Sequence, residues 1–143
     1  YLDLNMIRNY VTGDGARAYH HTAPISMLYG LHAGLGVVLE EGLEKAWARH
    51  QACGDELHRR LPELGFDLWA QPGHRLPDLT TVTLPEGLDD AKARATLLND
   101  YGVEVGGGLG PVAGKVWRIG CMGHTARMRN VRMLLGALEE IVS

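Results

Sequence analysis

Hydrophobic side chains recur at helical spacing in five stretches of the chain, separated by segments rich in glycine, proline and short polar residues. This periodicity predicts helices at about residues 1–11, 23–40, 43–64, 90–101 and 126–142. Short polar side chains suit the starts of three of these helices, and glycines suit two of their ends. The predicted N-caps are Thr22, Asp89 or Asp90, and Thr125, and the predicted ends are Gly65 and Gly102.

Four shorter segments between turn-forming residues are rich in β-branched or aromatic residues, which indicates strands. They are DLWAQ (67–71), LTTVTL (79–84), VEVG (103–106) and KVWRIG (115–120). Strand pairs with helices between them predict an α+β fold, in which helices pack on one face of a small, mostly antiparallel sheet. The helix at 23–40 would precede this layer.

The composition is that of a globular protein: 45% of the 143 residues are hydrophobic, 22% are charged, and the formal net charge is −3. A chain of this length can bury the core of one ordinary domain. The slightly acidic balance argues against a nucleic-acid partner, which requires a basic surface. No apolar stretch reaches the ~18–20 residues of a membrane span, so we expect no membrane segment. Two isolated cysteines, Cys53 and Cys121, suit small core residues in a reducing compartment.

The two ends of the chain carry few signals. It opens on YLDLNMIRNY, an amphipathic segment without an initiator methionine or the charge pattern of a signal peptide. We therefore expect a part of a longer polypeptide. The last residues, EEIVS, show no peroxisomal tripeptide, which favours a cytoplasmic location.

Common metal-binding and catalytic motifs are missing from the sequence. His20 and His21 are adjacent and so point in different directions, and no HxxxH or HExxH pair completes a ligand set. Gly114 and Lys115 lack the flanking glycine and hydroxyl residue of a P-loop. Neither of the two serines lies in a nucleophile elbow. We therefore predict no metal site and no nucleophilic triad.

Arg118 is a charged residue inside the apolar segment VWRIG. Alternation along a strand would put Trp117 and Ile119 on one face, with Val116, Arg118 and Gly120 on the other. A solvated surface arginine is one interpretation. The other is a guanidinium fork that binds a carboxylate, and the preceding glycine run, GGGLG at 106–110, favours it because glycines let backbone and ligand approach closely.

The segment YHHTAP, residues 19–24, also has two interpretations. In the structural one, Thr22 caps the following helix and Tyr19 packs. In the functional one, the two hydroxyl groups and the backbone amides at the helix start bind an anion. The residues alone leave both open.

Three motifs together, YHHTAP, RLPDLTTVTLP and GGLGPVAGKVWRIGCMG, resemble the alanine–glyoxylate and serine–pyruvate aminotransferases. These enzymes belong to the class V branch of the fold type I pyridoxal-phosphate enzymes. The likeness covers essentially the whole chain, but only the C-terminal part of such an enzyme.

The resemblance implies roles for particular residues. Tyr19 and Thr22 would contact the phosphate of the cofactor, pyridoxal 5'-phosphate, in the neighbouring subunit of a homodimer. Arg118 would bind the carboxylate of a small amino-acid or 2-oxo-acid substrate. The active-site loop beside it would contain Gly107, Gly108 and Gly110.

The resemblance also implies a domain organisation. Residues 1–23 would be a remnant of the large pyridoxal-phosphate domain, 24–42 an interdomain helix, and 43–143 the C-terminal small domain. The Schiff-base lysine would lie in the missing N-terminal large domain, because none of Lys45, Lys92 and Lys115 has the family context. The chain would then contain no catalytic residue, and we expect it to be inactive alone.

The predicted activity of the complete enzyme is transfer of an amino group from alanine or serine to glyoxylate or a similar small 2-oxo acid. One alternative is a non-enzymatic α+β interaction domain that dimerises through the helix at 24–42. Another is a fragment of a different class V enzyme, such as a cysteine desulfurase or a phosphoserine aminotransferase. Cys53 and Cys121 suit the first of these poorly, and extra cationic groups for a substrate phosphate are not evident.

Overall fold

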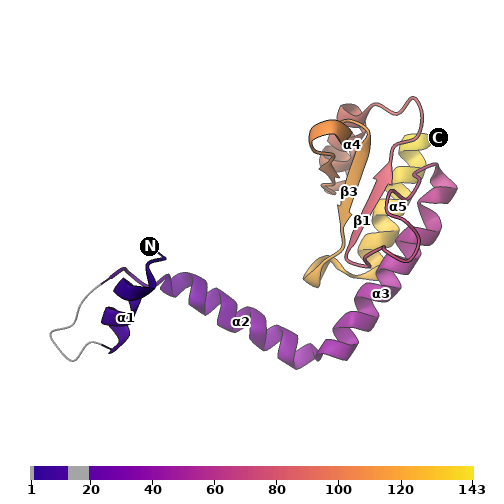
Figure 1. The fold of residues 1–143 in the computed structure, drawn as a ribbon. Helices are drawn as coiled ribbons and strands as arrows, with labels where there is room; N and C mark the ends of the chain where they lie inside the picture. The colour runs from indigo at the N-terminus through magenta and orange to yellow at the C-terminus, as the bar shows by residue number, and fades with distance from the viewer. Residues whose placement is uncertain (1, 13–19) are drawn as a thin grey trace. The chain divides into compact units, whose positions relative to one another are not determined.

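The computed structural model describes residues 2–12 and 20–143, which divide into two units, residues 1–40 and 41–143. In the first unit, α1 (Leu4–Thr12) begins where the Asp3 carboxylate accepts hydrogen bonds from the amides of Asn5 and Met6. The long helix α2 (Ile25–Glu41; Figure 1) begins two residues later than predicted. Its last residue, Glu41, is counted with the second unit. The apolar side chains of α2 lie exposed in this chain.

The second unit is a three-stranded sheet with helices on one face. Strands β1 (Leu79–Thr83), β3 (Val116–Gly120) and β2 (Gly106–Gly107) pair antiparallel in the order β1-β3-β2. The helices are α3 (Leu43–Arg60), α4 (Asp90–Tyr101) and α5 (Met128–Val142), and α3 and α5 lie side by side against the sheet (Figure 1). This confirms the predicted α+β fold.

The core lies between the sheet and these helices. Trp117 of β3 is fully buried and stacks on Phe66, with ring centroids 5.5 Å apart. Leu57 of α3 and Leu138 of α5 are buried in the same hydrophobic core cluster. Burying each such side chain stabilises the fold by about 1.5–3 kcal/mol. Leu43 and Trp47, near the start of α3, lie outside this core and are exposed.

Single capping residues in the sequence predicted both ends of α4 correctly. Asp89 caps α4 by accepting a hydrogen bond from the Lys92 amide at 3.0 Å. Gly102 ends α4 in the left-handed conformation (φ 65°), which favours glycine. The helix predicted for 43–64 is shorter, because α3 ends at Arg60 and Pro62–Leu64 form a 3₁₀ turn. Proline has no N–H with which to continue an α-helix.

Two predicted strands are wrong for most of their length. In the segment 67–71, only Leu68 forms a β-bridge, to Val82. In the segment 103–106, only Gly106 pairs with β3. The amide of Val103 bonds instead to the carbonyl of Leu97, as part of the end of α4.

Thr125 does not cap the last helix. It lies in a 3₁₀ turn, Gly123–Thr125, where its hydroxyl bonds to the amide and the carbonyl of Met122. The helix begins three residues later, with Arg127 as its N-cap residue. Within the described part of the chain, no helix is long and apolar enough to cross a membrane.

Candidate functional site

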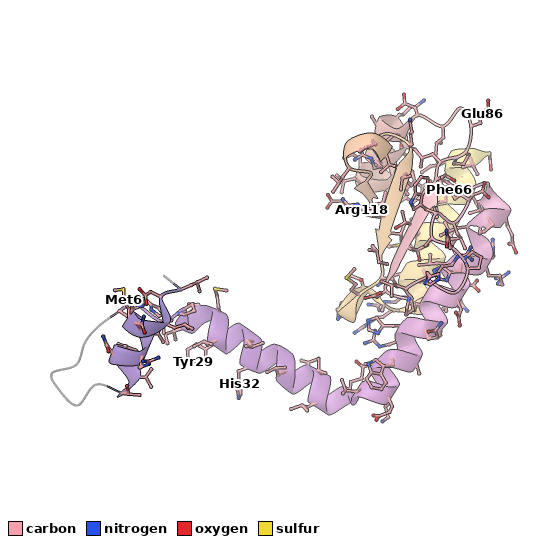
Figure 2. The ribbon with its side chains drawn as sticks, viewed as in Figure 1. Met6, Tyr29, His32, Phe66, Glu86 and Arg118 are labelled. Carbon is pink, nitrogen blue, oxygen red and sulfur yellow. The ribbon has the colours of Figure 1, made fainter. Side chains whose placement is uncertain are left out.

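Arg118 projects from the sheet face that the helices leave uncovered. Along β3, Trp117 and Ile119 are buried in the core, whereas Arg118 between them is exposed. Figure 2 shows Arg118 on the side of β3 away from α5. The alternation predicted for Trp117, Arg118 and Ile119 is therefore present, and the guanidinium is accessible to a ligand.

The guanidinium of Arg118 is held by β2. Its Nε donates a hydrogen bond of 3.0 Å to the carbonyl oxygen of Gly107. Gly106 lies opposite Arg118 in the strand register, and a Cβ there would come within 3.4 Å of Nη2. Glycine at 106 thus leaves space for the fork. Among the residues that the structure describes, no carboxylate forms an ion pair with Arg118.

The glycine run continues from β2 into a tight turn. A Cβ on Gly108 would lie 2.1 Å from the carbonyl oxygen of Val112, so only glycine fits this close approach of two backbone segments. Gly110 has a φ of 55°, in the left-handed region. Gly107, Gly108 and Gly110 therefore shape the loop next to Arg118.

The opposite face of β3 carries a polar network that the sequence did not reveal. The indole N–H of Trp117 donates to Oδ1 of Asp90 at 2.7 Å, and Arg94 donates to both oxygens of the same carboxylate. The bond from Arg94, followed by that from Trp117, lowers the pKa of Asp90 below its ordinary value. Arg94 also packs against Gly107. The network fastens α4 to β3 and β2.

A second group of residues holds the turn after β3. Arg49 of α3 donates through Nη1 to the carbonyl oxygens of Gly123 and Ala126, at 2.8 and 2.6 Å. Its Nε and Nη2 bond to the Glu41 carboxylate, at 2.6 and 2.8 Å. His50 accepts the Gly123 amide at Nε2, at 2.9 Å. We call Glu41, Arg49 and His50 the clasp.

The residues predicted to bind phosphate belong to the first unit. Tyr19 lies outside the described residues. Thr22 is exposed, three residues before α2, and follows His20 and His21, whose Nδ1 atoms lie 2.6 Å apart. Arg118 and the glycine loop are brought together in the second unit, and Thr22 is described only within the first.

Neither cysteine has the surroundings of a nucleophile. Cys53 and Cys121 are free thiols and both are buried. Burial, and then the nearby Cys53, raises the pKa of Cys121 to about 11, so this thiol is uncharged at neutral pH. Within residues 2–12 and 20–143, no three His, Cys, Asp or Glu side chains are grouped to hold a metal ion.

Comparisons with known proteins identify the family. The chain is 44% identical to an alanine–glyoxylate aminotransferase of Callithrix jacchus over 98% of its own length and 34% of that protein. It is 37% identical to the (S)-ureidoglycine–glyoxylate transaminase of Bacillus subtilis over 99% of its length and 34% of that protein. The solved structure of an alanine–glyoxylate aminotransferase from Nostoc sp. superposes with a TM-score of 0.85 at 43% identity, covering 99% of the chain and 37% of the structure. No protein-family model matches.

These similarities, together with the helix-covered sheet, define a part of a fold type I aminotransferase. More narrowly, the chain corresponds to the C-terminal part of a class V aminotransferase. It spans about a third of the length of the curated relatives it matches.

Proposed function

We propose that this chain supplies the substrate-carboxylate arginine, Arg118, and cofactor-phosphate contacts, Tyr19 and Thr22, to a pyridoxal-phosphate-dependent aminotransferase. The complete enzyme transfers an amino group from alanine or serine to glyoxylate or a similar small 2-oxo acid. The observation that carries this proposal is the exposed guanidinium of Arg118, held by a backbone carbonyl and without an ion pair among the described residues.

Arg118 recognises and orients the substrate. Its Nε is occupied by Gly107, so the remaining N–H groups are available to a ligand carboxylate. Charge-assisted hydrogen bonds of this kind contribute roughly 1.5–3 kcal/mol. Arg118 lies on β3, which is the middle strand of the sheet. A carboxylate bound to Arg118 is therefore fixed relative to the fold. A substrate held in this way presents its reacting carbon in a constant pose.

The start of α2 has donors that fit a phosphate. Thr22 provides a hydroxyl group, and the amides of a helix's first turn favour anions, although that of Ile25 already donates to the carbonyl oxygen of Ala23 at 2.8 Å. Tyr19 would add a second hydroxyl, and in the proposal both residues serve the neighbouring subunit of a homodimer. When bound, pyridoxal phosphate supplies the electron sink for chemistry at the α-carbon of the amino acid.

The lysine that holds the cofactor covalently is proposed to lie outside this chain. Lys45, Lys92 and Lys115 are all exposed on the surface. A Schiff-base lysine is activated by desolvation in an apolar pocket or by a neighbouring cation, and an exposed position does not provide a desolvating pocket. The chain alone is therefore inactive in the proposal.

The exposed apolar surface of α2 supports the proposed domain organisation. Met27 is 73% exposed and Leu39 is 81% exposed, on a helix with no charged residue before Glu40. Such a surface is normally covered by another part of a protein. We assign residues 1–23 to the large domain, 24–42 to an interdomain helix and 43–143 to the small domain. The homodimer and the cytoplasmic location stay predictions.

The names of the relatives support glyoxylate as the amino acceptor. The two relatives compared above both carry glyoxylate in their names, whereas their amino donors, alanine and (S)-ureidoglycine, differ. The names of the relatives therefore support the amino acceptor more strongly than the amino donor.

Substituting Arg118 in the complete enzyme tests the proposal. Arg118→Ala removes the fork and should lower kcat/KM for the 2-oxo acid about ten- to a hundredfold, because a charge-assisted contact is lost. Arg118→Lys keeps the charge without the fork geometry and should fall between the wild type and the alanine variant. Unchanged kinetics in both variants would remove the assignment.

A further inference from the structure

The backbone between Arg118 and the clasp is held at every residue. Ile119 and Gly120 pair with β1, and the Cys121 amide bonds to the carbonyl of Asp78 at 2.8 Å. The Met122 amide bonds to the hydroxyl of Thr125 at 3.1 Å, and Gly123 is held by Arg49 and His50. A shift of the Gly123 backbone would therefore also displace residues 119–122 and, with them, the strand that carries Arg118.

The Arg49 guanidinium is fixed in its plane by Glu41. The carboxylate accepts from Nε and Nη2 in a two-bond fork, which sets the orientation as well as the position of the guanidinium. Nη1 is then directed at the two carbonyl oxygens of the turn. Glu41 is the last residue of α2, and Gly42, with a φ of 83°, separates it from α3.

His50 holds the same turn from its other side. Because Nε2 accepts the Gly123 amide, Nδ1 is the ring nitrogen that acts as the donor. This Nδ1–H donates to the carbonyl of Ala46, one turn earlier in α3, at 2.6 Å. Both backbone groups of Gly123 are thus bound by consecutive residues of a single helix.

We propose that Arg49 and Glu41 are positioning residues for Arg118: by fixing the turn after β3, they set the place at which the Arg118 guanidinium meets the substrate carboxylate. This inference rests on the function proposed above for Arg118. Arg49 acts through the backbone of residues 118–123 and is not a catalytic residue.

Kinetics of the complete enzyme provide the first test. Arg49→Gln removes the donors to the turn and should raise KM for the 2-oxo acid on the order of tenfold, with a smaller change in kcat, because a displaced binding group weakens substrate positioning. Glu41→Gln should change KM in the same direction by less, since Arg49 keeps its carbonyl contacts. Arg49→Lys should recover part of the loss.

The matched control is Arg59→Gln. Arg59 lies on the same helix and also forms ion pairs, but its two carboxylate partners, Glu56 and Glu63, lie in α3 or directly after it. This variant therefore removes an arginine and its ion pairs from the same helix without touching the turn, and KM should equal that of the wild type.

Amide hydrogen exchange in the 143-residue chain provides a readout that needs no cofactor. Arg49→Gln should accelerate exchange at Cys121 and Gly123 about tenfold, because local opening becomes easier. Arg59→Gln should leave both rates unchanged.

The outcomes separate this inference from the proposed function. If Arg118→Ala weakens substrate use while Arg49→Gln has the KM of Arg59→Gln, the positioning role is overturned and the function of Arg118 stands. If the exchange rates at Gly123 do not change in Arg49→Gln, the positioning role is also overturned. If Arg118→Ala leaves the kinetics unchanged, the proposed function fails, and the positioning role fails with it.

Discussion

The Nε of Arg118 lies 3.0 Å from the carbonyl oxygen of Gly107, across the pairing of β3 and β2. The anchor is a neutral backbone group, so it orients the guanidinium without balancing its charge. No carboxylate among the described residues supplies that balance. The carboxylate of a bound substrate would supply it.

Gly108→Ala should destabilise the chain. The added Cβ would meet the Val112 carbonyl oxygen at 2.1 Å and its carbon at 2.8 Å, so the loop would have to open. We expect the free energy of unfolding to fall by ~1–3 kcal/mol in urea titrations, as for other overpacked sites.

Gly136→Ala is the matched control for this substitution. Gly136 lies within α5, and a Cβ there meets nothing within 4 Å. Because alanine has a higher helix propensity than glycine, this variant should be more stable than the wild type by about 0.5–1 kcal/mol. Equal stabilities of the two alanine variants would contradict the tight loop.

Cys121 should make the stability of the chain sensitive to alkaline pH. Its pKa is raised from 9.0 to about 11 by burial, so the folded state holds the proton more tightly than the unfolded state. The corresponding stability is fully present below pH 9 and is lost as the pH rises toward 11. The difference in unfolding free energy between wild type and Cys121→Ala should therefore shrink over this range. A difference independent of pH would count against the buried thiol.

The contribution of Asp90 to stability should be lost in acid, the opposite pH dependence to that of Cys121. Bonds from Arg94 and Trp117 hold the pKa of this carboxylate below 3.8, so its contribution is present above that pH and is lost as the pH falls through the lowered value. Asp90→Asn weakens both bonds and should reduce stability at neutral pH by ~1–3 kcal/mol. In acid, the two proteins should converge. Asp100→Asn, at an exposed position of the same helix, is the control and should behave like the wild type.

The fold was predictable where the signal was local. The caps of α4 and the strands β1 and β3, rich in β-branched and aromatic residues, are set by neighbouring residues, and their predicted positions match the structure to within a residue. The strand predicted at 103–106 failed because Val103 completes the end of α4. The prediction that Thr125 caps the last helix was wrong because the hydroxyl of Thr125 bonds to the backbone of Met122 and not to the amides of α5.

The same division applies to the candidate site. The exposure of Arg118 followed from alternation along one strand, and the glycine run marked the loop beside it. The clasp had no such signal, because Arg49 and Gly123 are 74 residues apart in the sequence. Glu41 and Arg49 are eight residues apart and belong to different helices, so helical periodicity could not relate them.

The most direct test compares a carboxylate substrate with its carboxamide in the complete enzyme, for the wild type and for Arg118→Gln. The wild type should prefer alanine to alaninamide by about ten- to a hundredfold in kcat/KM, because a guanidinium binds an anion more strongly than a neutral amide. Arg118→Gln should lose most of this preference. If the variant kept the full preference, another residue would be binding the carboxylate, and the role given to Arg118 would be wrong.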